Sequence, residues 1–556
     1  MDSSRPTSFT FRGRPESAEA GETLLQALLR KGLPTLQRSI RYHRPRAPFC
    51  GIGHCTNCLV RVNGEPNVRA CRYTPRPGDA VTTSNAWPSP QYDVMGVLDF
   101  LFPRGLDTLH GFRRPAWATP WFQRVVRRLA GYGSVATTAP APLPSSSAAI
   151  ELDVLVIGAG PAGRQAAQRL ATGGRPVGLL DRGAIPAPPP GVSLFPEVTA
   201  VFLPPPASVA DRPFEVVALE EPYRGRLFRA RTVVIASGAY DASLLFAGND
   251  RPGVMTADGA LAMATGDRAP PFRRALIVGG GLRTAQLLDR FGVHTEAVAA
   301  PGPISPEVTR RASDLSIDLY PRTLLLAASG RGRVRRAHLT ARGGGPEFSV
   351  PIDAIVLAHR RVPHSQLLFQ AGAEMEWRGT AGSFFPVLGE GCRTTVPGLY
   401  AVGEVAGFAE GVAAEASALA AADAVLGRAV PPATVRGPDG PNELEGYYRE
   451  LLRFPVGLTK QVACPCEDVL LSEVREAVAQ GYRGMEVVKR YTGVGTGLCQ
   501  GRYCLPDLLL VLSIVEGRSP REVGYIRQRP PVIPTPLSAL AELPESPPEI
   551  VAPGSS

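Results

Sequence analysis

Residues 153–183 read DVLVIGAGPAGRQAAQRLATGGRPVGLLDRG, and this stretch decides the fold of the central part of the chain. An apolar run, DVLVI, leads into a Gly-x-Gly-x-x-Gly turn formed by Gly158, Gly160 and Gly163, and a helix-like segment and a second apolar run follow. In such a unit the first Gly permits a tight turn, the second admits a pyrophosphate, and the third lets helix and strand pack closely. The stretch therefore predicts a Rossmann-type unit that binds an adenine dinucleotide.

An acidic residue completes this fingerprint. Asp181 ends the second strand, 23 residues after Gly158, at the place where a carboxylate is expected to bind a ribose hydroxyl. Because the two strands, the helix and the acid are all in register, the pattern is much more specific than three glycines alone. The predicted binding residues of this turn also include the neighbours Pro161, Ala162 and Arg182.

Two further strand–turn segments favour FAD as this dinucleotide. RTVVIASGA ends in a small-residue turn with Ser237 and Gly238, and PGLYAVGEVAG places Gly403 and Glu404 before an Ala-rich helix. In two-dinucleotide flavoproteins the second type of segment places an acidic residue beside the flavin ribityl chain, and Glu404 stands where Asp is commoner. The alternative for Glu404 is a packed strand–helix unit without a ligand.

A second Gly turn occurs in RALIVGGGLRTAQLLDRFGVHTEAVAA, and its pattern is weaker. Gly279 and Gly281 fit the fingerprint, but Thr284 occupies the place of the third Gly and the acid, Glu296, falls within a strand. The segment therefore has two interpretations, an NAD(P) site or the vestigial scaffold of one. Both stay open.

The first of two cysteine sets lies in FCGIGHCTNCLVRVNGEPNVRAC. Cys50, Cys55, Cys58 and Cys71 have the spacing C-x4-C-x2-C-x12-C, which matches the plant-type arrangement of thiolates around a 2Fe–2S cluster. Zinc sites usually contain two C-x2-C pairs, so a zinc site or idle buried cysteines fit this spacing less well. The set predicts an iron–sulfur cluster.

The second set consists of Cys464, Cys466, Cys499 and Cys504, spaced C-x-C-x32-C-x4-C. Pro465 supports a sharp turn between the first two ligands, and the glycines before Cys499 expose backbone N–H donors to an anionic cluster. Helical stretches follow both pairs, so their N-terminal dipoles are expected to point towards the site. We predict a second 2Fe–2S cluster, with zinc as the alternative.

The bulk composition describes an ordinary globular protein. Of 556 residues, 44% are apolar and 20% charged, and the net charge is +10. Nearly all of the positively charged residues are Arg. No basic motif with interleaved aromatic residues indicates nucleic-acid binding. The N-terminus shows no apolar signal region, and the longest aliphatic run, LPDLLLVLSIV, is too short to span a bilayer. We therefore expect a cytoplasmic protein without a membrane span.

The predicted fold class is α/β, with a two-dinucleotide-binding Rossmann-type core between two small cysteine-containing domains. The predicted divisions are a ferredoxin-like domain of β-grasp fold (1–86), an irregular wrap with a Pro/Ala/Ser linker (87–149), an FAD/NAD(P)-binding domain (150–430), a linker (431–455), a small helical 2Fe–2S domain (456–520) and a Pro-rich tail (521–556).

The order of these motifs resembles that in the α subunit of heterotetrameric sarcosine oxidase and its relatives, the D-hydroxyproline/proline dehydrogenases, opine oxidases and hydrogen cyanide synthase. The similar stretches include RYHRPRAPFC, TSNAWPSPQYDV, RPGVMTADGA, GEVAGFAEG and CQGRYC. The similarity extends over about residues 10–520. The chain looks like a fusion of that subunit with the ferredoxin-like subunit that the dehydrogenase relatives often carry separately.

The resemblance implies an FAD-dependent oxidoreductase subunit that transfers electrons for a partner. In such complexes a partner flavoprotein subunit oxidises the C–N bond of an amino or imino acid, and the α-like chain passes the electrons on through flavin and iron–sulfur centres. No catalytic side chain is therefore predicted in this chain. The resemblance also implies that residues 456–520 are similar to bacterioferritin-associated ferredoxin.

The chain departs from the family in two ways. The folate-binding C-terminal part of sarcosine oxidase α has no counterpart here, so folate chemistry is not expected. The segment 182–213 is also shorter than in the relatives, which puts the depth of FAD enclosure in doubt. Two other functions stay open: a freestanding NAD(P)H-dependent reductase that uses the Gly279 turn, and a non-enzymatic redox sensor or scaffold.

Overall fold

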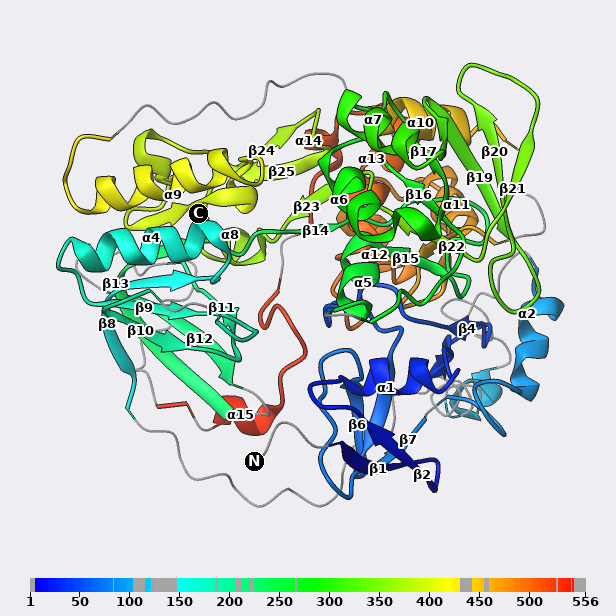
Figure 1. The fold of residues 1–556 in the computed structure, drawn as a ribbon, viewed down its shortest axis with the longest axis horizontal. Coiled ribbons are helices and arrows are strands. Elements are labelled where there is room, and N and C mark those ends of the chain that lie inside the picture. Colours follow the sequence, from blue (N-terminus) through cyan, green and yellow to red (C-terminus); the bar gives the residue numbers. More distant parts are fainter. Residues whose placement is uncertain are drawn as a thin grey trace.

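The first Gly turn follows strand β8 of a seven-stranded sheet in the computed structural model (Figure 1). Residues described by the structure are 6–83, 85–103, 116–121, 124, 148–185, 189–205, 213–220, 224–265, 268–430, 443–454, 460–526, 529–541 and 543–544. Most of the Pro/Ala/Ser linker expected before residue 150, and residues 545–556 of the expected tail, lie outside the described residues.

The seven-stranded sheet forms the first nucleotide unit. Its order is β10-β9-β8-β13-β12-β11, and β26 pairs with the end of β13. The strands β8, β9, β10 and β26 run parallel to their neighbours, whereas β11, β12 and β13 form an antiparallel meander. The strands are β8 (Ile150–Ile157), β9 (Val177–Leu180), β10 (Val192–Phe195), β11 (Val198–Phe202), β12 (Phe214–Glu220), β13 (Arg224–Ile235) and β26 (Leu399–Ala401).

Two helices pack side by side next to this sheet (Figure 1). Helix α4 (Pro161–Thr172) begins at Pro161, whose fixed φ suits the first helical position. Helix α9 (Val412–Val425) confirms the Ala-rich helix expected before residue 427. Because the facing residues are mostly Ala and Gly, the two helix axes approach closely. The elements η4 (Glu390–Cys392), η5 (Gly403–Ala406), α8 (Gln366–Gln370), β24 (Met375–Arg378) and β25 (Ser383–Pro386) complete the unit.

The second nucleotide unit is inserted into the first. A short antiparallel ribbon of β14 (Ala239–Asp241) and β23 (Arg361–Pro363) marks where the chain leaves and returns. Between them lies an all-parallel sheet of order β15-β22-β16-β17-β18, with near-continuous apolar strands that are typical of sheets buried on both faces. Its strands are β15 (Val254–Thr256), β16 (Ala275–Val278), β17 (Thr295–Ala299), β18 (Asp318–Tyr320) and β22 (Ala354–Leu357).

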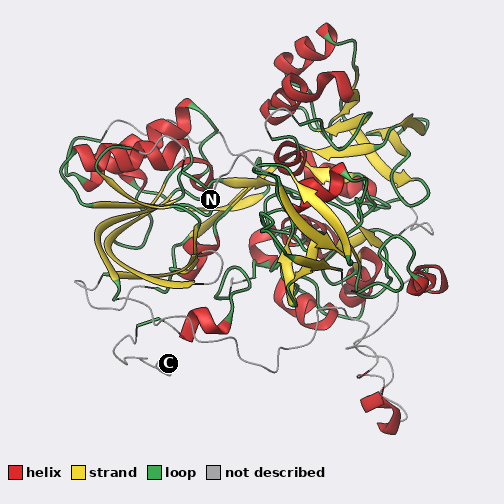
Figure 2. Cartoon of the chain, turned by 60° about the horizontal axis from the view of Figure 1, so that its bottom comes forward, coloured by secondary structure: helices red, strands yellow, loops and turns green. Residues whose placement is uncertain are grey.

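Helices and a small meander lie around that second sheet (Figure 1), and Figure 2 shows the helices in red beside the strands in yellow. The helices are α5 (Ala257–Met263), α6 (Leu282–Phe291), η3 (Gly292–His294) and α7 (Pro306–Asp314). The meander is antiparallel and consists of β19 (Thr323–Ser329), β20 (Arg336–Ala341) and β21 (Phe348–Pro351). The predicted 150–430 region thus contains two Rossmann-type units, the second inserted into the first.

The N-terminal region forms a five-stranded mixed sheet of order β2-β1-β7-β5-β6, crossed by one helix. This arrangement agrees with the β-grasp fold expected for residues 1–86. Its elements are β1 (Thr7–Phe11), β2 (Arg14–Ala18), α1 (Leu24–Arg30), β5 (Leu59–Val62), β6 (Glu65–Arg69) and β7 (Ala80–Thr82), with a small ribbon of β3 (Gln37–Arg38) and β4 (Pro45–Arg46). The described part of the expected wrap contains η1 (Val94–Gly96), α2 (Val97–Leu101) and η2 (Ala116–Ala118).

The C-terminal region is helical, as predicted. Its elements are β27 (Val462–Cys464), β28 (Val469–Leu470), α11 (Leu471–Ala479), α12 (Met485–Thr492), α13 (Leu505–Glu516) and α14 (Pro520–Val523). None of the helices in the described part of the chain is both long and apolar enough to cross a membrane.

The predicted linker and the predicted tail each contain a helix. The expected linker 431–455 contains helix α10 (Glu443–Leu451), which packs on α13 and β19 because its buried face carries Leu and Tyr side chains. The expected tail contains α15 (Leu537–Ala541), which packs on β13, where Gly225 leaves room for the Ala539 carbonyl. The sequence did not indicate either helix, because each apolar face is short and is flanked by Pro and Gly residues.

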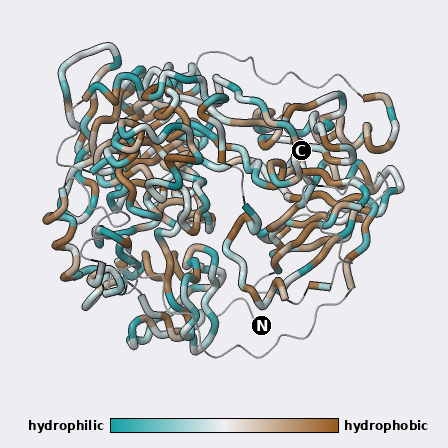
Figure 3. The backbone as a smooth tube through the Cα atoms, turned by 180° about the vertical axis from the view of Figure 1, so that it is seen from behind, coloured by the Kyte–Doolittle hydropathy of each residue, from teal (hydrophilic) through white to brown (hydrophobic). Residues whose placement is uncertain are grey.

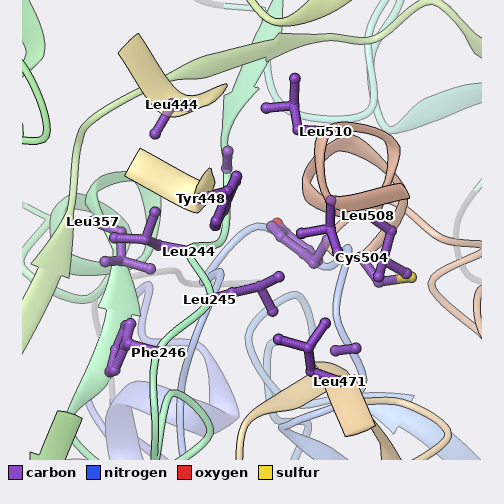
Figure 4. Packing of buried hydrophobic residues seen from close by; sticks show 14 of the residues in the cluster. Leu244, Leu245, Phe246, Leu357, Leu444, Tyr448, Leu471, Cys504, Leu508 and Leu510 are labelled. Carbon is purple, nitrogen blue, oxygen red and sulfur yellow. The ribbon is translucent and has the colours of Figure 1, made fainter. Parts of the chain in front are cut away.

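One hydrophobic core joins three regions of the chain. Buried residues of the first cysteine loop, the second nucleotide unit and the C-terminal helices belong to a single cluster. Figure 4 shows part of it, with Leu244 and Leu357 facing Tyr448, Leu508 and Cys504. Figure 3 shows that apolar segments of the backbone lie mainly in the interior of the molecule. The cysteine-bearing domains are therefore integral parts of the fold and not loosely tethered modules.

Candidate functional site

The first Gly turn has the shape that its fingerprint predicts. A Cβ on Gly158 would lie 2.3 Å from the Ala236 carbonyl oxygen, and one on Gly163 would lie 1.8 Å from the Gly158 oxygen. A Cβ on Gly160 would meet no atom within 4 Å. The protein itself thus requires Gly158 and Gly163, whereas Gly160 borders open space at the start of α4. This cradle fits the pyrophosphate of a dinucleotide.

Because of these contacts, substitutions at Gly160 and Gly163 should have different effects, one on flavin binding and the other on folding. We expect Gly160→Val to fold with an unchanged melting temperature, because no protein atom opposes the new side chain, and to bind flavin about tenfold more weakly or worse, about 1.4 kcal/mol. Gly163→Ala should instead lose folded protein, because its Cβ would overlap the Gly158 carbonyl. Thermal unfolding and flavin absorbance per chain measure both effects. Full flavin content in Gly160→Val would contradict the assignment.

The other predicted residues of this site converge on the same turn. The Asp181 carboxylate accepts hydrogen bonds from the backbone N–H groups of Ala159 at 2.7 Å and Gly183 at 2.8 Å, so it lies against the turn. A Cβ on Gly403 would lie 3.1 Å from that of Ala162. Three segments far apart in the sequence therefore meet at the N-terminus of α4.

Glu404 and the small-residue turn also lie together. A Cβ on Gly238 would be 3.8 Å from Glu404 Oε2, and the Ser237 hydroxyl donates to the His364 carbonyl at 2.9 Å. The Glu404 carboxylate is paired with the Arg361 guanidinium, at 3.0 and 2.9 Å. Its charge is thus already balanced within the protein, which the sequence did not indicate.

Protein packs closely on part of the second Gly turn, but a Cβ on Gly281 would meet no atom within 4 Å. A Cβ on Gly280 would lie 2.4 Å from the Pro303 carbonyl oxygen, and the Ser305 N–H donates to the Gly280 carbonyl at 2.8 Å. Glu296 lies in β17, as predicted, and pairs with Arg274 at 2.9 Å. Gly279 and Gly281 flank this contact, at the end of β16 and the start of α6.

The first cysteine set is gathered around one buried loop. Backbone N–H groups of His54 and Cys55 donate to Cys50 Sγ at 3.4 and 3.3 Å. The Cys55 and Cys71 thiols are hydrogen-bonded to Cys50, and Cys58 to Cys71. Burial raises the pKa of Cys50, but the hydrogen bonds from Cys55 and Cys71 outweigh it and hold that pKa well below its usual range. Inward N–H groups around clustered thiolates suit an iron–sulfur cluster.

The second cysteine set forms two sulfur pairs in the C-terminal domain. Cys466 is hydrogen-bonded to Cys499, and Cys464 to Cys504. The bond with Cys466, together with two backbone N–H groups of the following loop, lowers the pKa of Cys499 to about 7. Helix α13 begins directly after Cys504, as expected. Within the described residues, no three His, Cys, Asp or Glu side chains have the spacing to hold a single metal ion. Cys392 lies apart, buried beside α9.

Five aromatic side chains lie between the two cysteine sets and the first nucleotide unit. The ring centroid of Tyr240 is 5.8 Å from that of His54 and 4.8 Å from that of His364. Tyr503 lies 5.5 Å from Tyr240 and 5.1 Å from Phe49. We call this group the aromatic junction. Its members come from all three regions that share the core.

Each end of the aromatic junction is next to a predicted site. Phe49, His54 and Tyr503 each directly precede a cysteine of one of the two sets. At the other end, the backbone N–H of His364 donates to the Gly238 carbonyl at 3.0 Å. The junction therefore connects both sets to the small-residue turn of the first nucleotide unit.

Arg182 contacts the first cysteine loop across the domain boundary. Its guanidinium group meets His54 Nε2 and donates to the Ile52 carbonyl at 3.4 Å, while Arg72 donates to the Arg182 carbonyl at 2.5 Å. Burial and the positive charge of Arg182 hold the pKa of His54 well below its usual range. His54 is thus neutral at neutral pH, and the loop next to Cys55 carries no imidazolium charge.

The sequence alone did not single out the aromatic junction. His364 follows strand β23, and no residue near it in the sequence indicates a contact with His54. The available signal was position: His54 and Tyr503 stand inside cysteine motifs, at places where a bulky ring must face either solvent or a neighbouring domain. Only packing decides between these two.

Three family models match parts of the chain. Residues 4–86 match the 2Fe-2S iron-sulfur cluster binding domain, residues 208–423 the pyridine nucleotide-disulphide oxidoreductase, and residues 459–543 the sarcosine oxidase A3 domain. The fold and the site thus define an oxidoreductase with an FAD-binding fold and an iron–sulfur cluster domain.

Relatives agree with these matches. Sarcosine oxidase subunit alpha of Rhizobium meliloti (strain 1021) is 29% identical over 97% of this chain, which spans 58% of that protein's length. Hydrogen cyanide synthase subunit HcnA of Pseudomonas aeruginosa is 42% identical, matching 14% of this chain and 71% of its own. The chain is thus similar to sarcosine oxidase α subunits and to opine oxidase A subunits. The predicted resemblance is confirmed.

A solved structure shares the fold of nearly the whole chain. The L-proline dehydrogenase from P. horikoshii superposes with a TM-score of 0.66 at 21% identity, and the match covers 97% of this chain and 98% of that one. The likeness confirms the predicted fold class, including the order of its domains.

Proposed function

We propose that this chain is the electron-transferring subunit of a complex that oxidises an amino or imino acid of the sarcosine, proline/hydroxyproline or opine type. A partner flavoprotein subunit removes electrons from the substrate, and this chain receives them. The observation that carries the proposal is the aromatic junction, because it places both cysteine sets and the Gly238 turn around one buried group of rings.

The residues of the first nucleotide unit would hold FAD, which supplies the exchange between two-electron and one-electron chemistry when bound. Gly160 and the N-terminus of α4 would receive the pyrophosphate, and Asp181 a ribose hydroxyl. Arg361 neutralises Glu404 beside the small-residue turn. The buried rings of the aromatic junction exclude water from the space between the sites.

We propose that Cys50, Cys55, Cys58 and Cys71 hold one 2Fe–2S cluster and Cys464, Cys466, Cys499 and Cys504 a second. The match of residues 4–86 to a cluster-binding domain supports the first. The inward N–H groups after Cys499 and the start of α13 support the second, since both favour a negatively charged group. At the Gly279 turn protein packs on Gly280, but Gly281, which corresponds to Gly160, borders open space, so this turn keeps room for an NAD(P) pyrophosphate.

Purification of the native protein together with its partner tests this function. We expect a hetero-oligomer in which the amino-acid substrate reduces flavin and iron–sulfur signals, whereas the single chain mixed with that substrate shows no reduction. The separated partner, added back, should restore the reduction. Rapid oxidation of NADH by the single chain with an artificial acceptor would instead establish a freestanding reductase and overturn the proposal.

A further inference from the structure

The loop of the first cysteine set directly contacts the second set. The Thr56 hydroxyl, between Cys55 and Cys58 in the sequence, donates to Cys466 Sγ at 3.4 Å. Both residues are 6% exposed, so no bulk water competes for this bond. With a cluster bound, Cys466 would be a thiolate ligand, and the neutral hydroxyl would donate a charge-assisted hydrogen bond to it. The two proposed cluster sites therefore meet at a specific polar contact.

A small shared cavity confirms that the sets are neighbours. Its volume is about 20 Å³, and its wall includes Cys55 from one set and Cys466 from the other, with Phe49, Asn57 and Tyr503. That volume holds about one water molecule. Because Cys55 and Cys466 both line this cavity, the two sites share a wall.

Buried ion pairs hold the two loops in this register. The Arg46 guanidinium donates to the Pro465 carbonyl at 2.9 Å and pairs with Asp468, on the loop that carries Cys466. It also pairs with Asp250 of the second nucleotide unit at 3.0 Å. Three regions of the chain are thus fixed around the Thr56 contact, which is preorganised and does not depend on a mobile surface side chain.

We propose that Thr56 is a positioning residue that couples the two cysteine sets into one redox unit. This inference rests on the proposed function, since it needs a cluster at each set. The hydroxyl bond to Cys466 stabilises the extra negative charge of the reduced second centre and so raises its reduction potential. The step is a single-electron transfer: one electron leaves one centre, the other centre gains it, and the proton stays on Thr56.

Two Thr56 variants of the full chain test this role, with EPR-monitored redox titration as the readout. Thr56→Val keeps the shape of the side chain but removes the donor, so the potential of the second centre should shift to a more negative value. Thr56→Ser keeps the donor and should retain the wild-type potential. Equal potentials in all three proteins, or equal shifts in both variants, would overturn the role of the hydroxyl.

A second measurement tests the coupling if Thr56→Val loses its iron. In the fully reduced wild-type chain, the two centres should broaden each other's EPR signals, and Cys58→Ser should remove that broadening from the remaining signal. Purely additive spectra would show that the sets are not coupled. Iron analysis separates this failure from that of the proposed function: iron for only one cluster per wild-type chain refutes the second centre itself.

Discussion

Replacing Cys58 with Ser is expected to remove one of the two proposed clusters, and with it about half of the iron and visible absorbance of the chain. Cys58 is buried and hydrogen-bonded to Cys71, so a serine oxygen there cannot replace the thiolate without leaving the cluster a weaker ligand. Iron analysis, visible absorbance and EPR of the purified full-length variant measure the loss.

The ninth cysteine provides the matched control for this substitution. Cys392 is as buried as the ligands but lies beside α9, away from both sets. Cys392→Ala should therefore keep the full iron content, even if it lowers stability by a small amount. An unchanged spectrum in Cys58→Ser, or an equal loss in both variants, would contradict the assignment of the first set.

The second large effect is expected at Arg46. Its side chain is 2% exposed and pairs with Asp250 and Asp468, which are themselves buried. Arg46→Met keeps much of the volume but leaves buried carboxylates without this partner, a change that typically costs about 3–5 kcal/mol. Because Arg44 still pairs with Asp250 at 2.6 Å, the main loss should fall on Asp468 and the C-terminal domain.

Urea unfolding with a probe in each domain measures this effect. The C-terminal helical signal and the iron absorbance should both be lost at lower urea in Arg46→Met than in the wild-type chain. Arg310→Ala is the control, because the Arg310–Asp314 pair is 65% and 66% exposed and contributes at most about 0.5 kcal/mol. Equal midpoints for the two variants would show that the buried pairs do not hold the domains together.

Much of the site could be predicted from sequence because its signals are local. The first Gly turn, its helix and Asp181 lie within 31 residues, and steric demands on a tight turn act through that short stretch alone. The cysteine spacings are local in the same way, since each pair of ligands shares a loop. The chemistry of these residue types and the periodicity of the strands between them could therefore be predicted from the sequence.

Other elements were not predicted, because their sequence patterns are short or resemble those of linkers. The sequence predicts a linker where α10 lies, because Pro and Gly dominate the residues before it. The buried face of α10 is recognised only from its packing on α13. Glu404 lies next to Gly238, and its pairing with Arg361 depends on the β14–β23 ribbon. No periodicity in the sequence reports such a contact.

The sequence by itself predicted which groups this chain is suited to hold: a dinucleotide at the Gly158 turn and iron at cysteine sets of fixed spacing. Only the tertiary structure decided how these sites are arranged. Thr56 and Cys466 are 410 residues apart, and Arg182 and His54 are separated by 128. Contacts over such separations depend on how buried ion pairs and a shared apolar core align whole domains. That alignment is a property of the packed chain, and no single stretch of sequence encodes it.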